Sequence, residues 1–243
     1  MWGRVVEDFE GRIGELSFWL RKMQGDWRVG WIYTTAAEPP AMTDSAVTWR
    51  RFAMPQTGLR LTPVMPDMPV VLRPAAPLAI FPGHVEKVYV SVPVTVRVES
   101  GEKESFVLCE LPTRRLSQSW FGQNTKEGRL CYALKTRARE MLPSVEEPDA
   151  PYRVICPLEV VNASQEARAF ERFCLHVPRM AVYKDARGLL WSNRCRVTYH
   201  GGDTREEAFL DDDAPAESKP SECVAQPREE AGGVLPGILN FFA

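Results

Sequence analysis

The sequence lacks the short motifs that mark the commonest catalytic and nucleotide-binding sites. It has no Gly-x-Ser-x-Gly nucleophile elbow, no His-Glu-x-x-His helix, no phosphate-binding loop and no dinucleotide fingerprint. Its three histidines, His84, His176 and His200, have no local partner that would make them a base or a metal ligand. These absences argue against an enzyme, and we expect no cofactor and no bound metal.

The cysteines show no metal-binding spacing, because no Cys-x-x-Cys pair occurs. The amino terminus also lacks a secretory signal pattern, which favours the reducing cytosol. We therefore expect the thiols to serve as small buried hydrophobes, with disulfides as the alternative. The six cysteines are Cys109, Cys131, Cys156, Cys174, Cys195 and Cys223.

Long apolar runs and a strong charge of one sign are both missing. No run approaches the roughly 20 apolar residues of a membrane-spanning helix, so we expect a cytoplasmic protein that could still associate peripherally with the inner membrane. The formal charge of -2 gives no overall basic field, and no nucleic-acid partner is expected. Acidic residues concentrate after Arg205, so the rest of the chain is mildly basic.

What the sequence does contain is segments in which apolar residues occupy every second position. Valine occupies every even position from Val88 to Val98, as in a half-buried strand, although Pro93 indicates an edge or a bulge. Similar segments separated by Gly and Pro turns predict an all-β, sandwich-like fold with at most short helices. The further predicted strands are Trp27 to Thr34, Ala46 to Ala53, Leu59 to Thr62, Val70 to Arg73, Ser105 to Leu111, Arg129 to Leu134, Tyr152 to Asn162, Ala169 to Val177, Met180 to Lys184 and Leu189 to Tyr199.

Two segments could be read as helices. Leu130 to Leu142 has apolar residues near one helical face, and we favour a strand followed by a short helix that ends at Pro143. Phe9 to Leu20 contains two glycines, so we expect it to be irregular or a strand.

The chain is expected to divide into three parts. Residues 1–65 form an amino-terminal β segment packed on the body, and residues 66–210 form the body, as one large sandwich or as two tandem or interlocked ones. Residues 211–243 form an acidic tail with an apolar end. The composition of Asp211 to Gly233 predicts disorder, because such a segment buries too little apolar surface to offset its ordering entropy.

The candidate binding site is the segment Ser119 to Leu134, which we interpret as a shaped loop. Trp120 could stack on a ligand while polar neighbours supply hydrogen bonds, although the aromatics could equally be buried architecture. The basic side chains on either side of the segment could lie on the same surface as Trp120 and form an anion-binding site. Such a site would suit phospholipid headgroups better than nucleic acid. The candidate residues are Trp120, Gln123, Asn124, Thr125, Lys126, Glu127, Arg114, Arg115, Lys135 and Arg137.

The apolar end of the tail is a second candidate site. After a flexible acidic spacer it could dock in a groove of the body or of a partner, or it could be a frayed terminus. The predicted docking residues are Leu235, Ile238, Leu239, Phe241 and Phe242.

Several of these segments together resemble a prokaryotic family known only as a domain of unknown function. They are Leu61 to Leu72, the run from Tyr89 to Val96, the run from Glu110 to Ser117, and the run from Trp120 to Ala133. Members of that family are often encoded beside small mechanosensitive channels of the inner membrane. The resemblance implies an accessory role and a protein partner, without a catalytic residue.

Three function classes follow from these observations. The first is a soluble β-rich binding or accessory module, whose partner is a protein such as a membrane channel. The alternative is a small-ligand or carbohydrate-binding sandwich domain that uses Trp120. The third is a sandwich-type hydrolase with distant carboxylates such as Glu110 and Glu127.

Overall fold

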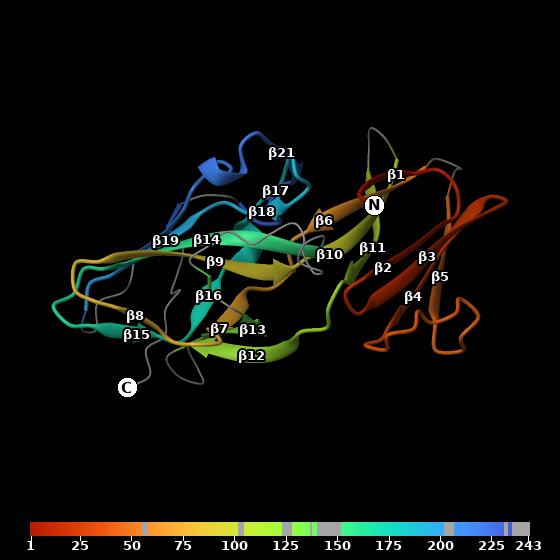
Figure 1. Ribbon diagram of the computed structural model, residues 1–243. Helices are drawn as coiled ribbons and strands as arrows, with labels where there is room; N and C mark the ends of the chain where they lie inside the picture. Colours follow the sequence, from red (N-terminus) through yellow and green to blue (C-terminus); the bar gives the residue numbers. More distant parts are fainter. Residues whose placement is uncertain are drawn as a thin grey trace. The chain divides into compact units, whose positions relative to one another are not determined.

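The computed structural model is all-β and sandwich-like, with strands in 59% of the chain and helix in 3%, which confirms the predicted fold class (Figure 1). It describes residues 1–54, 58–101, 105–122, 128–136, 138–139, 152–201, 207–230 and 233–234. The described helices are two short 3-10 turns, η2 (Val177–Arg179) and η3 (Ala216–Ser218). None of the described helices has the length and apolar character to span a lipid bilayer.

The chain forms two compact units, each built from discontinuous segments. Unit 1 comprises Met1–Val64 and Pro93–Arg115, and unit 2 comprises Met65–Val92 and Leu116–Ala243. The amino-terminal segment is thus joined in one unit by a hairpin from the middle of the sequence.

Unit 1 contains two antiparallel four-stranded sheets. Their strand orders are β2-β3-β4-β5 and β1-β6-β10-β11. The strands are β1 (Gly3–Val5), β2 (Phe9–Ile13), β3 (Leu16–Met23), β4 (Asp26–Tyr33), β5 (Thr48–Ala53), β6 (Leu59–Val64), β10 (Thr95–Ser100) and β11 (Phe106–Pro112).

The core of unit 1 forms because successive side chains of a strand point to opposite faces of the sheet, and the large apolar ones share one face. Phe18, Leu20, Trp27 and Val29 lie on one face of β3 and β4 and are fully buried. Glycine on this sheet makes room for an aromatic ring: a Cβ atom on Gly30 would lie 2.7 Å from the indole of Trp49, its cross-strand partner. The indole therefore packs over the bare glycine backbone.

Unit 2 contains one large mixed sheet and two smaller ones. Their orders are β21-β17-β18-β14-β19-β20-β22, with β9 paired to β14, then β12-β13-β7-β16, and β15-β8. The strands are β7 (Val70–Pro74), β8 (Leu78–Ile80), β9 (Val85–Pro93), β12 (Ser117–Gly122), β13 (Gly128–Thr136), β14 (Arg153–Asn162), β15 (Arg168–Phe170), β16 (Phe173–Leu175), β17 (Val182–Asp185), β18 (Leu190–Trp191), β19 (Cys195–Tyr199), β20 (Glu207–Leu210), β21 (Ser221–Ala225) and β22 (Gly233–Val234).

Strand β14 is the centre of the large sheet. Five consecutive residues from Val154 to Leu158 are buried, as expected for a strand covered on both faces. Pro157 is tolerated because β14 changes neighbour at this point, pairing with β18 at Ile155 and with β19 from Leu158 onward.

The prediction of one continuous strand from Val88 to Val98 is wrong. Strand β9 ends at Pro93 and β10 begins at Thr95, and the two belong to different units. Proline cannot donate a ladder hydrogen bond, so the chain leaves one sheet here and enters another.

The interpretation of Ser119 to Leu134 as a loop is also wrong for most of its length. β12 and β13 pair as antiparallel strands, with Ser119 opposite Cys131 and Trp120 opposite Leu130. Strand β13 extends to Thr136, which confirms the strand that we favoured at the start of Leu130 to Leu142. The short helix that we expected after this strand falls on residues that lie mainly outside the described part.

The predicted disorder of the acidic tail is wrong for residues 211–230. Strand β21 pairs with β17. Backbone hydrogen bonds and ion pairs therefore order a segment that, from its composition alone, was expected to be disordered. The predicted docking residues Leu235, Ile238, Leu239, Phe241 and Phe242 lie outside the described residues.

The six cysteines are all free thiols, and five of them are buried, in agreement with the expected role as small hydrophobes. Cys223 on β21 is the exposed exception. Burial raises the pKa of Cys156 and of Cys195 to about 12. These thiols are therefore protonated packing residues at neutral pH.

Candidate functional site

The hairpin β12–β13 presents an exposed apolar pair. Trp120 and Leu130 lie directly opposite each other, and each is 46% exposed. A Cβ atom on Gly128 would clash with the Trp120 indole, so the ring lies against the hairpin backbone. Phe121, next along the strand, is buried with Val71, Cys131 and Cys174. One aromatic of the predicted site, Phe121, is thus architectural, and the other, Trp120, is about half exposed.

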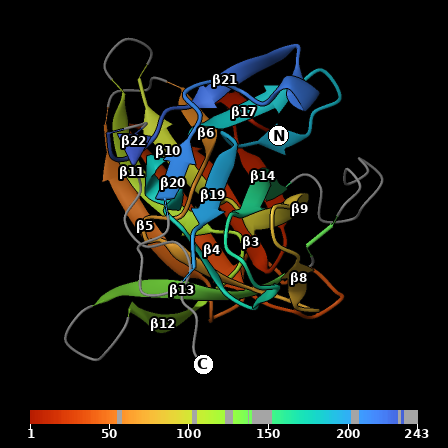
Figure 2. The same ribbon diagram turned by 90° about the vertical axis from the view of Figure 1, so that its left-hand side faces the viewer.

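β12 is the outer strand of its sheet among the strands that the structure describes (Figures 1 and 2). Its sequence, Ser-Gln-Ser-Trp-Phe-Gly, contains no charged residue and no proline. Natural sheets commonly block unwanted pairing at an edge with such residues. The outer strands of unit 1 carry them, since β5 holds Arg50 and Arg51, and β11 holds Glu110 and Pro112.

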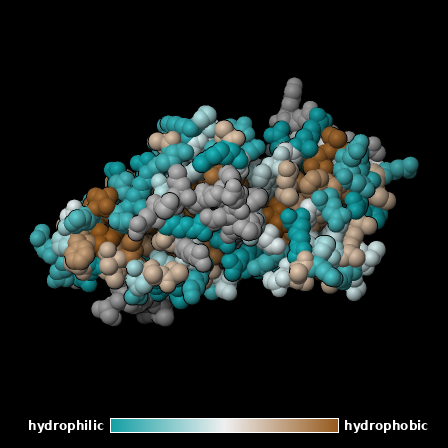
Figure 3. All heavy atoms as spheres, in the orientation of Figure 1, coloured by the Kyte–Doolittle hydropathy of each residue, from teal (hydrophilic) through white to brown (hydrophobic). Residues whose placement is uncertain are grey.

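The face of the molecule that Figure 3 draws is mainly hydrophilic where it is coloured. Figure 3 shows separate brown, hydrophobic patches on a largely teal face of the molecule. On unit 2 the exposed large apolar side chains are Phe81, Val85, Trp120, Leu130 and Phe209. Among these, Trp120 and Leu130 form a cross-strand pair that includes the uncharged edge strand β12.

The other predicted site residues have varied positions. Arg114 forms an ion pair with Glu15 at 3.4 Å, and the Arg115 guanidinium lies 4.3 Å from the centre of the Tyr33 ring. Both arginines belong to unit 1, whereas Trp120 and the exposed Lys135 belong to unit 2. Gln123, Asn124, Thr125, Lys126, Glu127 and Arg137 lie outside the described residues.

The hydrolase hypothesis depended on distant carboxylates. Glu110 accepts a 2.7 Å hydrogen bond from Arg97 Nε, and Glu127 lies outside the described residues. No group of three or more His, Cys, Asp or Glu side chains in the described part of the chain is arranged to hold a metal ion.

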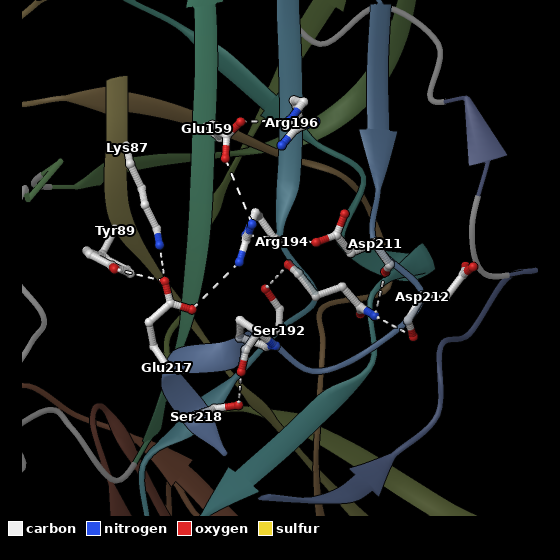
Figure 4. A network of polar contacts seen from close by, with 12 residues as sticks. Lys87, Tyr89, Glu159, Ser192, Arg194, Arg196, Asp211, Asp212, Glu217 and Ser218 are labelled. Carbon is white, nitrogen blue, oxygen red and sulfur yellow. Dashed lines mark hydrogen bonds and ion pairs between the residues drawn. The ribbon is translucent and has the colours of Figure 1, made fainter. Parts of the chain in front are cut away.

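A polar network of unit 2 joins three strands to the acidic segment (Figure 4). Glu217, the middle residue of η3, forms ion pairs with Lys87 of β9 and with Arg194, and the Tyr89 hydroxyl donates to it at 3.4 Å. Arg194 also lies 3.9 Å from Glu159 of β14. Because Glu217 and Glu159 each have basic partners, the network holds residues 211–218 against the sheet.

Asn193 extends this network along the backbone. Its Nδ2 donates to the carbonyl oxygens of Asp211 and Asp212 at 2.9 and 3.2 Å, and its Oδ1 accepts from Ala181 N. The buried amide therefore fixes the start of the acidic segment, a role that no sequence pattern indicated.

An open cleft of about 690 Å³ lies beside this segment, lined in part by Tyr183, Asp213, Lys219 and Cys223. The Tyr183 hydroxyl already donates to the Asp212 carbonyl and accepts from Asn193. Burial raises the pKa of Tyr183 and of Cys223. A raised pKa disfavours the reactive thiolate of Cys223 at neutral pH.

The profile of one protein family, described as a protein of unknown function (DUF432), matches residues 1–239. The chain belongs to this family. No curated protein and no solved structure matches it. Family membership therefore agrees with the resemblance noted in the sequence, and the function of this DUF432 protein has to be argued from its own surface.

Proposed function

We propose that this DUF432 protein is a binding module that docks a protein partner on the β12–β13 hairpin. The observation that carries the proposal is an uncharged, proline-free edge strand beside the exposed pair Trp120 and Leu130. An extended segment of a partner can add to such an edge through backbone hydrogen bonds. Its apolar side chains would then cover the Trp120 and Leu130 side chains.

The uncharged edge strand β12 favours a protein segment over a charged ligand. Backbone donors and acceptors of the edge supply affinity, and an aromatic anchor beside them is typical of residues that dominate protein interfaces. The family resemblance favours a membrane channel of the small mechanosensitive class as the partner. The protein would then be cytoplasmic and peripheral at the inner membrane.

Co-purification with that channel from native membranes tests the proposal. Leu130→Lys places a charge beside Trp120 without uncovering Gly128, and it should remove the channel from the purified fraction. The matched control is Phe81→Ala, which removes an exposed apolar side chain elsewhere on unit 2 and should leave co-purification intact. Equal recovery of the channel with both variants would refute docking on the hairpin.

A second candidate function is the binding of a small ligand or carbohydrate on Trp120. It is favoured by the half-exposed indole, which the hairpin backbone holds in place at Gly128. A glycan-binding screen checks this candidate: a hit that survives Trp120→Ala, in protein with an unchanged circular dichroism spectrum, would reject it.

A further inference from the structure

A row of three arginines crosses the sheet β2-β3-β4-β5 of unit 1. Arg21 lies opposite Arg28, and Arg28 lies opposite Arg51. Directly opposite residues project from the same face, with Cβ atoms about 5 Å apart. Three guanidinium-bearing side chains therefore stand side by side, and their mutual repulsion would be relieved by an anion between them.

The two outer arginines of the row have acidic partners. Arg21 lies 3.7 Å from Asp8, and Arg51 forms an ion pair with the buried Asp26. Arg28, in the middle, is exposed and has no ion pair with any residue within the described ranges. The centre of the row thus keeps an uncompensated positive charge that faces solvent.

Apolar side chains surround the row on the same face. Trp49 is two residues before Arg51 on β5 and is 41% exposed, and Met23 is two residues after Arg21 on β3 and is exposed. Met42 reaches the row from the segment between β4 and β5, where its sulfur accepts a hydrogen bond from Arg21 Nε at 3.1 Å. The exposed part of the face therefore combines one tryptophan and two methionines with three arginines, and Glu10, opposite the buried Trp19, adds an acid on β2.

We propose that this arginine face, defined by Arg21, Arg28, Arg51, Trp49 and Met23, docks on a membrane surface of anionic phospholipid. Guanidinium groups bind phosphate oxygens with two parallel hydrogen bonds. Tryptophan and other apolar side chains enter the headgroup region beside them. A single-stranded nucleic acid would instead need several aromatic platforms for successive bases, and this face has one exposed tryptophan.

The arginine face lies in unit 1 and shares no residue with the β12–β13 hairpin. If the arginine face does not bind membranes, the proposed protein docking on the hairpin is unaffected. If the hairpin binds no protein, the proposed membrane binding is likewise unaffected. The two surfaces would together let one chain contact a membrane and a protein.

Flotation of the full chain with lipid vesicles tests the proposal. The protein should float with vesicles of phosphatidylcholine and phosphatidylglycerol in equal parts, and it should remain unbound with pure phosphatidylcholine or in high salt. Arg28→Gln should weaken the vesicle affinity about fivefold, since each arginine near an anionic surface contributes about that factor. Met23→Gln should also weaken the vesicle affinity, because it removes an apolar contact with the lipid.

Arg50→Gln is the matched control. Arg50 is the neighbour of Arg51 in sequence but lies over the Trp31 ring on the opposite face of the sheet, so its loss should leave vesicle binding unchanged. Equal binding to neutral vesicles, equal loss with Arg50→Gln, or competition by free glycerol phosphate at the vesicle's phosphate concentration would overturn the proposal. Tighter binding to single-stranded DNA than to anionic vesicles, weakened by Arg28→Gln, would overturn it in favour of a nucleic-acid surface.

Discussion

Asp185 holds the turn between β17 and β18 with one buried carboxylate. It accepts hydrogen bonds from the backbone N–H groups of Arg187 and Leu189, from the Trp191 indole and from the Arg187 guanidinium, at 2.9 to 3.1 Å. Burial acts to raise the pKa of Asp185, but the hydrogen bonds and the nearby Arg187 charge outweigh it and lower the pKa. The ionised carboxylate is therefore part of the folded state.

Asp185→Asn should destabilise the protein by about 3 kcal/mol at neutral pH, because the amide cannot replace the charge-assisted hydrogen bonds. In the wild type the folded pKa is depressed, so this stabilisation is complete above the unfolded carboxyl pKa of about 4 and is lost as the pH falls through the lower folded value. Urea unfolding at a series of pH values measures both effects. Unfolding free energies of wild type and variant that stay parallel in acid would contradict this assignment.

The thiols give a second prediction for single residues. A thiol-specific reagent should modify Cys223 first in the native protein, because it is exposed, and the remaining five cysteines only after unfolding. Burial protects all five, and it raises the pKa of Cys109 to about 11. Mass spectrometry after brief labelling identifies the modified residue. Fast native labelling of Cys131 or Cys174, whose sulfur atoms lie 3.8 Å apart, would show that this part of the core opens.

The acidic segment shows how an element can be held by ion pairs. Glu217→Gln should remove the charge that pairs with Lys87 and Arg194, at a cost of about 1–2 kcal/mol for these half-buried pairs. Residues 211–225 should then be cleaved faster by a nonspecific protease in limited proteolysis. Glu222→Gln, at an exposed position on β21, is the control and should leave the cleavage rate unchanged. If both variants are cleaved at the wild-type rate, the network does not hold the segment.

Local patterns predicted most strands but not how the strands pair. The alternation in β10 and the buried run in β14 follow directly from the sequence, because side-chain burial follows the pleat. Strand β13 was predicted as Arg129 to Leu134, but β12 was missed because its polar residues and the nearby glycines resemble a turn, and Trp120 was recognised without its partner Leu130. β21 was missed because its order comes from pairing with β17, about 40 residues earlier in the chain, which composition does not reveal.

The same limit applies to the arginine face. The dipeptide Arg50 and Arg51 was visible in the sequence, and the alternation of a strand implied that each arginine points to a different face. The register adds Arg21 and Arg28 to Arg51, and this row depends on two hairpins whose pairing no single segment specifies.

For the whole molecule, the chain passes between the two units near Val64, Pro93 and Arg115. Each unit has its own buried strands and its own candidate surface: the arginine face on unit 1 and the β12–β13 hairpin on unit 2.

Hydrogen exchange of the complex with the channel most directly tests whether β12 accepts a strand from a protein partner. Mass spectrometry would compare the free protein with the co-purified complex. The account predicts slower exchange at residues 117–122 in the complex, because the outer amides of β12 become hydrogen-bonded. Amide exchange in β5 should stay unchanged, because Arg50 and Arg51 on this edge strand disfavour the addition of another strand. A stable complex in which residues 117–122 exchange as fast as in the free protein would contradict the account.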